Sequence, residues 1–492
     1  MKKLLSTLFL IVVVMQLHAQ VKDFTVTTAE GVPVPYKILT GTKKQFDASV
    51  NEVGVLGTII SPTVDVIIPS TVTYGGVTYT VSSIETLRNS LLKTLTFPST
   101  LRNFGHDAFQ MVRLKDLYVP STIVNLTGLY QAEIDNLYLP ATGLKRIEDS
   151  YSMSFFTGRI HGFAQSEIEY IGEDVYDWTY SNDANGVIND LATLPSTIRE
   201  IGNQAFAIYN TDGLPLDKLI IPASMERLGN YVYTIAHDVY IKGTNPFTLG
   251  TTPFGTKPTL KVHVPVDRSF AFKAAADWAS YADKVIEDVK IGATGYTSYY
   301  LENENFLVPA GCTAYIITGT TPSGNITNPD QAVVKAFTAG KIIPKKTGFI
   351  LQGPANSTVV YQANVTGTEE NVADNYLVGT ATEQELSGAG YKYYVLADGS
   401  QGMGFYSQGT RGGESIKLGA HHAGLRLPVA IARAKSFTVD FEGARQEAEA
   451  TGISTVEETK QQHADVIYDL QGRRIVMPTH GIYIINGKKV IK

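Results

Sequence analysis

Cysteine is almost absent from this chain: among 492 residues there is only one, Cys312. A single cysteine excludes an intramolecular disulfide and any zinc motif built on paired cysteines. Cys312 lies in a strand-like apolar run, where a small buried hydrophobe is the ordinary role. Since no disulfide can form, the apolar core alone must stabilise the fold.

Long apolar runs are also scarce, and the first residues hold the longest one. Lys2 and Lys3 precede a mostly apolar stretch from Leu4 to Leu17, and Ala19 offers a small residue for cleavage. This layout predicts a secretory signal peptide over 1–19, because the apolar run is too short for a comfortable membrane span. We therefore expect a secreted or outer-surface protein, cleaved near Ala19 and without a membrane-spanning segment afterwards.

Runs of basic residues are missing too. The formal net charge is −6, and loss of Lys2 and Lys3 with the leader removes two positive charges and makes it −8. A negatively charged protein without a basic patch is a poor match to nucleic acid or to an anionic membrane. We therefore predict no nucleic-acid partner.

Motifs that carry catalysis or hold cofactors are absent as well. The sequence contains no HExxH, P-loop or GxSxG pattern. Oxygen-bearing side chains of the kind that calcium prefers gather in segment 181–190. Gly186 falls too early there for the EF-hand spacing, so a plain surface turn is the simpler interpretation. We predict a protein that is not an enzyme and that holds no metal and no cofactor.

What the chain has instead is a returning phrase of aliphatic residues that ends in proline. It reads LKTLTFPST at 92–100, LKDLYVPST at 114–122 and IDNLYLPAT at 134–142. Altered copies are found at 64–71, 190–197, 216–224 and 260–265. Most of the marker prolines follow one another at 20–29 residues, a period typical of a leucine-rich solenoid. No repeat can bury its apolar face alone, so the copies must stack into one long surface.

These patterns predict a mainly β fold with several parts. They are a leucine-rich repeat solenoid, an all-β domain of the sandwich type and a small C-terminal β module. The expected divisions are a signal peptide at 1–19, an N-terminal β cap at 20–62, the solenoid with its closing cap at 63–288, the all-β domain at 289–443, a linker at 444–463 and the C-terminal module at 464–492. The longest gap between marker prolines, Pro140 to Pro195, contains either a degenerate repeat or an inserted loop.

The repeat phrase, together with the IGNQAF ending at 201–206, resembles the BspA-like leucine-rich repeat family of Bacteroidetes surface proteins. The segment VPVDRSFAFKAAADWASYADKVIED at 264–288 is similar to that family's closing segment, where Trp278 would fill the last coil. The tail pattern YDLQGRR followed by GIYI resembles the C-terminal sorting domain of type IX secretion substrates; a β module that caps the fold is the alternative. The first resemblance implies adhesin-like behaviour.

The best candidate for a binding surface is an exposed column on the repeat sheet. In each phrase one residue lies between the buried aliphatic residue and the residue before proline, and alternation along a strand points it outward. The column consists of Ile67, Thr96, Tyr118, Tyr138, Thr193, Ile220, Tyr240 and His263. If the strands stack in register, Tyr118 and Tyr138 lie one coil apart. Such rings suit a partner protein or a sugar, while a ladder that only stabilises the sheet is the plainer interpretation.

We therefore expect an adhesin-like protein that binds an extracellular protein or polysaccharide through its repeat sheet. Two alternatives stay open: carbohydrate binding or processing by the all-β region, and a purely structural role in the cell envelope. An aromatic platform beside a carboxylate pair would mark the first alternative. The aromatic residues to examine for it are Tyr391, Tyr393, Tyr394, Phe405 and Tyr406.

Overall fold

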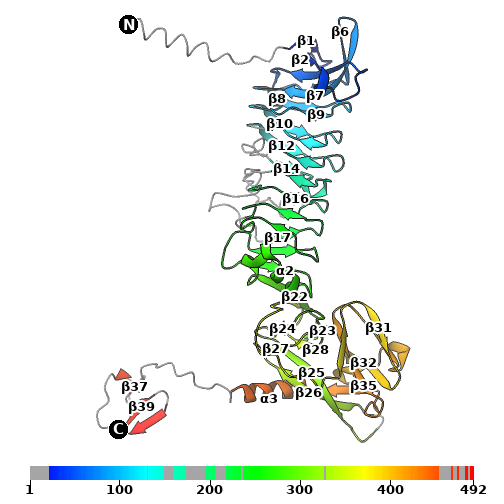
Figure 1. Cartoon of the computed structure of the whole chain (residues 1–492), viewed down its shortest axis with the longest axis vertical. Coiled ribbons are helices and arrows are strands. Elements are labelled where there is room, and N and C mark those ends of the chain that lie inside the picture. Colours follow the sequence, from blue (N-terminus) through cyan, green and yellow to red (C-terminus); the bar gives the residue numbers. More distant parts are fainter. Residues whose placement is uncertain are drawn as a thin grey trace.

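A computed structural model describes most of the chain. It covers residues 22–129, 131–148, 159–172, 194–205, 218–233, 236–325 and 328–453, and the short strands at 467–468, 474–475, 482–485 and 488–491. Figure 1 shows a tall stack of coils that joins a second, wider β region at its lower end. The fold is mainly β, as the sequence predicts.

The solenoid is built from coils that each add one longer and one shorter strand, and both sets run parallel. The upper long-strand sheet contains β4 (Ile60–Ser61), β5 (Val66–Ile67), β8 (Leu91–Thr96), β10 (Arg113–Tyr118), β12 (Glu133–Tyr138) and β14 (Arg159–His161). The lower long-strand sheet contains β17 (Lys218–Ile221), β19 (Asp238–Ile241), β21 (Lys261–His263), β22 (Val285–Ile291) and β29 (Ser357–Tyr361). The short-strand sheet contains β11 (Asn125–Leu126), β13 (Arg146–Ile147), β15 (Tyr170–Ile171), β16 (Glu200–Ile201), β18 (Arg227–Leu228) and β20 (Thr248–Leu249).

A separate sheet covers the first coil. Its strands are β1 (Phe24–Thr27), β2 (Pro33–Ile38), β3 (Glu52–Leu56), β6 (Thr71–Tyr74), β7 (Val77–Thr86) and β9 (Asn103–Phe104). The first three pair in antiparallel order, whereas β3, β7 and β9 run parallel to one another. The antiparallel strands of this sheet therefore cap the stack, and its parallel strands form the beginning of the stack.

The core of the solenoid is a column of aliphatic and aromatic side chains between the sheets. Leu95, Leu117 and Leu137 are fully buried and pair in register from coil to coil. Phe104 and Phe109 are also buried, with ring centroids 5.1 Å apart in an edge-to-face arrangement. The repeat phrase thus places the same residue type at the same depth in each coil.

One glycine shows how closely the coils approach. Gly143 has a φ of 89°, and a Cβ there would lie 1.8 Å from the backbone oxygen of Ser121 in the preceding coil. Any side chain would force the two coils apart, so glycine is required at this turn.

The gap between Pro140 and Pro195 contains a degenerate repeat. Strand β14 pairs with β12 and strand β15 pairs with β13, so residues 159–172 continue both sheets. Residues 149–158 and 173–193, which include segment 181–190 and Thr193, lie outside the described residues.

Trp278 fills the end of the last coil, as expected. It is fully buried, its ring lies 4.8 Å from that of Phe272 and 5.2 Å from that of Phe247, and its indole N–H donates to the Phe247 carbonyl. The surrounding elements are α2 (Ser269–Ala274) and the 3-10 helix η5 (Ala276–Tyr281).

The second region is all-β, and its main sheet is nearly closed and barrel-like where a sandwich was expected. In order, the nine strands are β23 (Tyr296–Tyr300), β28 (Gly348–Gln352), β25 (Thr313–Thr321), β26 (Asp330–Phe337), β36 (Ser436–Val439), β33 (Gly402–Tyr406), β32 (Tyr391–Gly399), β35 (His422–Pro428) and β30 (Leu377–Thr380). The first and last strands of this order, β23 and β30, lie next to each other.

The reason for this curvature lies in strands that are buried on both faces. Along β25, Tyr315 and Ile317 belong to one hydrophobic core, while Ala314 and Ile316 belong to another. One core fills the curled sheet, and the other lies outside it beneath β24 (Phe306–Leu307) and β27 (Ile342–Ile343). Cys312 is buried in the outer core, as predicted, and burial raises the pKa of its thiol.

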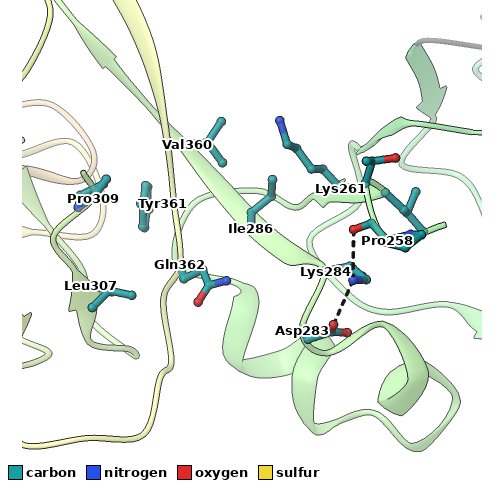
Figure 2. Close-up of a pocket in the computed structure, with 12 residues that line it drawn as sticks. Pro258, Lys261, Asp283, Lys284, Ile286, Leu307, Pro309, Val360, Tyr361 and Gln362 are labelled. Carbon is teal, nitrogen blue, oxygen red and sulfur yellow. Dashed lines mark hydrogen bonds and ion pairs between the residues drawn. The ribbon is translucent and has the colours of Figure 1, made fainter. Parts of the chain in front are cut away.

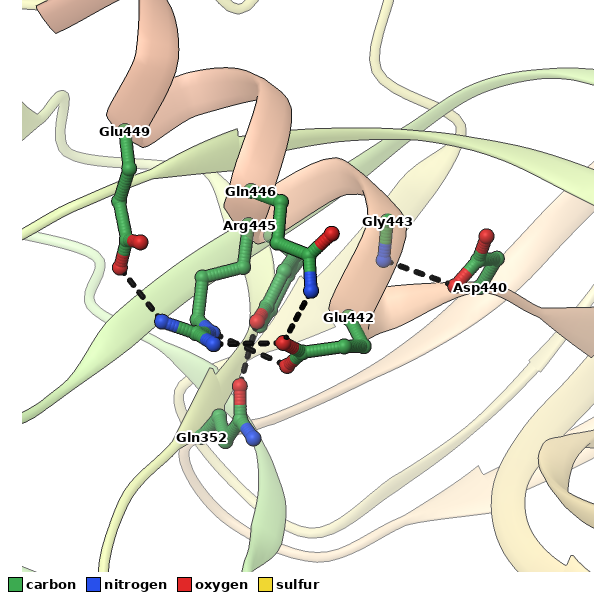
Figure 3. Close-up of polar contacts among 8 residues, drawn as sticks. Gln352, Asp440, Glu442, Gly443, Arg445, Gln446 and Glu449 are labelled. Carbon is green, nitrogen blue, oxygen red and sulfur yellow. Dashed lines mark hydrogen bonds and ion pairs between the residues drawn. The ribbon is translucent and has the colours of Figure 1, made fainter.

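Helix α3 (Phe441–Ile453) follows the barrel-like sheet and occupies the first part of the expected linker. Its N-terminus is capped by Asp440, whose carboxylate accepts the Gly443 N–H at 2.8 Å. Figure 3 shows Arg445 between two carboxylates of the same helix, Glu442 and Glu449, with N–O distances of 2.6 Å to each. The tail contains β37 (Ile467–Tyr468), β38 (Arg474–Ile475), β39 (Ile482–Ile485) and β40 (Lys488–Ile491), which form one antiparallel sheet.

The two main regions share strand β22. Its first residues pair with β21 of the solenoid, while its later residues, from Glu287 to Ile291, pair with β29 of the second region. The expected boundary between residues 288 and 289 therefore falls inside a strand, and hydrogen bonding continues across it.

A buried carboxylate, Glu287, anchors this junction. It accepts hydrogen bonds from the backbone N–H groups of Asp267 (2.9 Å), Arg268 (3.0 Å) and Ser269 (2.8 Å), and from the Tyr361 hydroxyl (2.5 Å). The three N–H groups lie at the start of α2, and Tyr361 lies on β29. One side chain therefore ties the last coil to the second region.

A second buried carboxyl, Glu304, lies beside Glu287. Its Oε2 accepts the Phe270 N–H at 2.8 Å, while its Oε1 has no donor among the described residues. Burial, together with the neighbouring Glu287, raises the pKa of Glu304 to about 10. Glu304 is therefore protonated at neutral pH.

The proton on Glu304 makes the stability of the junction depend on pH. Glu304 has a pKa of about 4.3 in the unfolded chain, so between that value and the raised one the folded chain holds the extra proton. The free energy of unfolding therefore falls as the pH rises through this range.

We expect Glu304→Gln, which has no proton to lose, to flatten this pH dependence. Thermal midpoints of wild type and variant, measured from about pH 5 to pH 10, test it. Parallel curves for the two proteins would show that Glu304 is ionised in the folded state.

Candidate functional site

The predicted column exists on the upper long-strand sheet. Tyr118 on β10 is the register partner of Tyr138 on β12, which confirms that the two tyrosines lie one coil apart. Tyr138 is in turn the partner of His161 on β14. On the other side of Tyr118 lies β8, where Leu95 is the partner of Leu117 and Thr96 is the next residue. Thr96 is in turn the partner of Ile67 on β5.

The three rings form a continuous stack. The centroids of Tyr118 and Tyr138 are 4.2 Å apart with planes 6° from parallel, and those of Tyr138 and His161 are 4.4 Å apart at 14°. Both faces of Tyr138 are therefore covered. Tyr118 keeps one open face, which is directed toward Thr96, and 51% of its surface is exposed. We call these three residues the ring ladder.

A row of polar side chains supports the ring ladder from the same face. Asn136 donates from Nδ2 to Asp116 Oδ1 at 2.8 Å, so its Oδ1 is left to accept from His161 Nε2 at 3.1 Å. This fixes the orientation of the His161 ring. Loss of hydration, with the hydroxyl of Tyr138, raises the pKa of Tyr118, so this side chain stays uncharged at physiological pH.

Sequence reasoning missed His161 as a member of the column. In this coil Phe163 takes the place of the marker proline and Gly162 that of the residue before it, so the phrase is not recognisable. The dipeptide Ile160–His161 before that glycine, one aliphatic residue followed by one ring, was the signal that could have found it.

Exposed aliphatic side chains lie at both ends of β8, the strand on the open side of the ladder. Ile60 on β4 is opposite Leu91 on β8, just as Ile67 is opposite Thr96. Ile60 is 61% exposed, Ile67 48% and Leu91 39%. Large apolar side chains left in water on neighbouring strands are typical of contact surfaces. We call Ile60, Ile67, Leu91 and Thr96, together with the open face of Tyr118, the ladder end.

The remaining column residues form a separate group on the lower long-strand sheet. Ile220, Tyr240 and His263 are register partners on β17, β19 and β21. Tyr240 and His263 stack at 4.2 Å, and the ammonium groups of Lys218 and Lys242 lie 4.7 and 5.9 Å from the centroid of the Tyr240 ring. The upper and lower groups belong to different sheets, and Thr193, which would lie between them, is outside the described residues.

The expectation that His263 faces solvent is wrong. His263 is only 5% exposed, because Tyr240 covers one face of its ring and carboxylates flank its edge. Its Nδ1 lies 2.9 Å from Asp288 and its Nε2 lies 3.3 Å from Asp238. Asp288 belongs to β22, which extends the sheet beyond the last repeat phrase. His263 therefore stabilises the junction side of the sheet and is not a contact residue.

The five aromatic residues of the all-β region do not form a platform. Tyr393, Tyr394 and Phe405 are buried in its cores. Tyr406 donates its hydroxyl to the Gly402 carbonyl across its own hairpin, and Tyr391 has the Arg426 guanidinium 4.9 Å from its ring centroid. The buried three lie where these strands are covered on both faces, so they fill the interior.

The opposite face of the solenoid has a different character. Ion pairs join outward side chains of neighbouring coils beside the short-strand sheet: Arg199 with Glu226, Arg227 with Glu200, and Lys145 with Glu167 and Glu169. Arg146 also covers the Tyr170 ring, 4.2 Å from its centroid. Exposed pairs of this kind contribute little stability. They leave a solvated face whose charges are already matched.

The described residues contain no group of three or more potential metal ligands. Among the same residues, no helix has the length and hydropathy needed to cross a membrane.

Two parallel sheets stacked coil on coil define a leucine-rich repeat solenoid, and comparison with family models agrees. Residues 80–186 and 164–242 match the model described as the BspA type leucine-rich repeat region, with 6 copies. No curated protein matches the sequence.

Two solved structures are similar to parts of the chain. One is the crystal structure of a leucine-rich repeat protein from Bacteroides ovatus ATCC 8483, at 16% identity over 49% of this chain and 72% of that one, with a TM-score of 0.24. The other is the pneumococcal vaccine antigen PcpA, at 11% identity over 54% of this chain and 97% of that one, with a TM-score of 0.24.

Position 96 on β8 is the next position of the ring ladder beyond Tyr118, and threonine leaves it without a ring. A tyrosine at residue 96 would lie one strand from Tyr118 and stack on its open face. We expect Thr96→Tyr to raise the free energy of unfolding by about 0.5–1 kcal/mol, as cross-strand aromatic pairs do. Chemical denaturation measures the change, and Lys115→Tyr, at an exposed position outside the column, is the control. An equal effect of both substitutions would mean that stacking on Tyr118 is not the cause.

Proposed function

We propose that this protein is an exported, adhesin-like binding protein that contacts an extracellular macromolecule through its upper long-strand sheet. The contact surface that we assign is the ladder end with the ring ladder behind it. One observation carries the proposal: rings and large aliphatic side chains are left in water together on this face. On the opposite face, outward charges of neighbouring described coils pair with one another.

A protein is the partner class that this surface favours over a polysaccharide. A sugar ring binds by lying flat on an aromatic face, and of the two ladder tyrosines only Tyr118 offers one. The neighbouring Ile60, Ile67 and Leu91 offer apolar area but no hydrogen bonds. Aromatic and aliphatic side chains at the centre of a contact are typical of protein–protein interfaces.

The proposal predicts that the two tyrosines are needed for binding. We expect Tyr118→Ala combined with Tyr138→Ala to abolish capture of the partner on an array of extracellular-matrix proteins and polysaccharides. The thermal midpoint should change by only a few degrees, since stacked aromatic pairs contribute about 0.5–1.5 kcal/mol. Tyr170→Ala, which removes a tyrosine from the opposite face, is the matched control and should bind normally.

Three outcomes would contradict this assignment. A partner retained by the double variant would place the contact elsewhere in the chain. Unfolding of the double variant would make the ladder a structural element of the sheet. A partner that is a polysaccharide would overturn the choice of partner class while keeping the surface.

Export is the second part of the proposal, and the sequence pattern at residues 1–19 supports it. We propose cleavage after Ala19, a bacterial source among the Bacteroidetes and a tail, 464–492, that serves as a type IX sorting signal. N-terminal sequencing of the mature protein should begin at Gln20. Removal of 464–492 should retain the protein inside the cell envelope; unchanged secretion would leave the tail as a β module only.

A further inference from the structure

The upper long-strand sheet leaves a narrow space above Thr96. Thr96 on β8 pairs with Ile67 on β5 on one side and lies beside Tyr118 on β10 on the other. Neighbouring strands are about 4.8 Å apart, so the strands that carry Tyr118 and Ile67 are separated by roughly twice that distance. The threonine side chain ends one atom beyond its Cβ, whereas the tyrosine ring extends much further from the sheet. We call the space above Thr96, between Tyr118 and Ile67, the slot.

The walls of the slot are uncharged and open to solvent. Tyr118 is 51% exposed, and Tyr138 covers only the face of its ring that points away from the slot. Ile67 is 48% exposed, and Thr96 at the floor is exposed as well. A flat group that enters from solvent would therefore contact a ring on one side and an aliphatic side chain on the other.

The chain itself shows that aromatic rings stack at this spacing. The Tyr118 and Tyr138 rings are 4.2 Å apart, and the Tyr138 and His161 rings are 4.4 Å apart. On the lower long-strand sheet, Tyr240 and His263 stack at 4.2 Å with planes 17° from parallel. Each pair joins equivalent positions of adjacent strands. A ring in the slot would continue the ring ladder by one step.

The charges around the slot cancel. The charged side chains on β8, on β10 and on the residue before β5 are Lys93, Arg113, Lys115, Asp116 and Asp65. Asp65 pairs with Lys93 at 3.2 Å, and Arg113 pairs with Glu133 of β12 at 2.7 Å. The other two, Lys115 and Asp116, have opposite charges. A charged group would lose hydration in the slot without a net charge to attract it, so the slot favours a neutral occupant.

We infer that the slot receives a neutral aromatic side chain of the protein partner: a phenylalanine, tyrosine or tryptophan. This inference rests on the proposed function and names the residue type that anchors the contact. A guanidinium also stacks on rings, but it would bring an unmatched charge. A sugar would place its hydroxyl groups against Ile67, which cannot bond them. Rings enclosed by a partner's side chains are typical of interface hot spots.

The pocket at the junction of the two regions does not select a ligand in this way. It has a volume of about 420 Å³, and Figure 2 shows Lys261 and Lys284 beside Ile286 in its lining. Lys284 pairs with Asp283 at 3.1 Å, and Lys261 is the register partner of Asp238. Because these charges are also matched and no ring face repeats there, we assign that pocket no ligand.

The first test is ¹⁹F NMR on the full chain in which Tyr118 alone is replaced by 3-fluorotyrosine, which keeps the ring. We expect N-acetyltyrosinamide to shift this resonance saturably, because its ring stacks on the open face. N-acetylleucinamide is neutral but has no ring, and it should give at most about a fifth of the shift. N-acetylargininamide and methyl glucoside should also give smaller shifts than the tyrosine amide.

The same label at Tyr231, an exposed tyrosine in another coil, is the control for unspecific stacking and should respond weakly. An equal response of the two labels would overturn the inference. So would a larger shift with the arginine amide or the glucoside, or the absence of a saturable shift with the tyrosine amide.

The second test fills the slot from within the chain. Thr96→Tyr should lower capture of the partner on the protein array at least about tenfold while the chain stays folded, because its own ring occupies the slot. Thr78→Tyr, the same substitution at an exposed position of the cap sheet, should bind normally. Capture retained by Thr96→Tyr but lost in the double tyrosine variant would overturn the slot and keep the proposed function. If no protein is captured at all, the proposed function fails and the ¹⁹F titration alone decides whether the slot binds rings.

Discussion

Parallel stacking of the coils is the constraint on which the rest of this structure depends. Each coil has one apolar face that it cannot bury by itself, so Leu95, Leu117 and Leu137 must lie over one another in register. The same register places each outward-facing residue of one coil over the equivalent residue of the next coil. The ring ladder is thus a direct consequence of burying the leucines, because tyrosine at the same place in two phrases must stack in space.

The end of the stack imposes a second requirement, since the last coil leaves a sheet edge that must be covered. The chain meets it by continuing β22 into a pairing with β29 and by burying Glu287 between the two regions. Its donors come from both regions, so neither can separate without exposing an unpaired carboxylate. The raised pKa of Glu304 follows from this closure.

The two faces of the solenoid differ in what their outward side chains already contact. On the short-strand face, charges on successive coils satisfy one another, and Arg146 covers the only described ring of that sheet. On the upper long-strand face, polar contacts lie behind the rings and fix them, while the aliphatic side chains of the ladder end stay exposed. A surface that is held rigid and left apolar loses little entropy on binding, which favours it as the contact face.

The sequence by itself determined the solenoid, and it predicted the pairing of Tyr118 with Tyr138 for strands that stack in register, because a repeated phrase brings equivalent positions together. It also indicated that Trp278 closes the last coil. Only the tertiary structure decided the fate of residues whose neighbours come from distant parts of the chain. His263 is buried because Asp288 belongs to an added strand, and Tyr393 is interior because the sheet around it curls nearly closed. The local sequence pattern predicts which face of its strand a side chain occupies. Whether that face is buried depends on which distant segment of the chain packs against it.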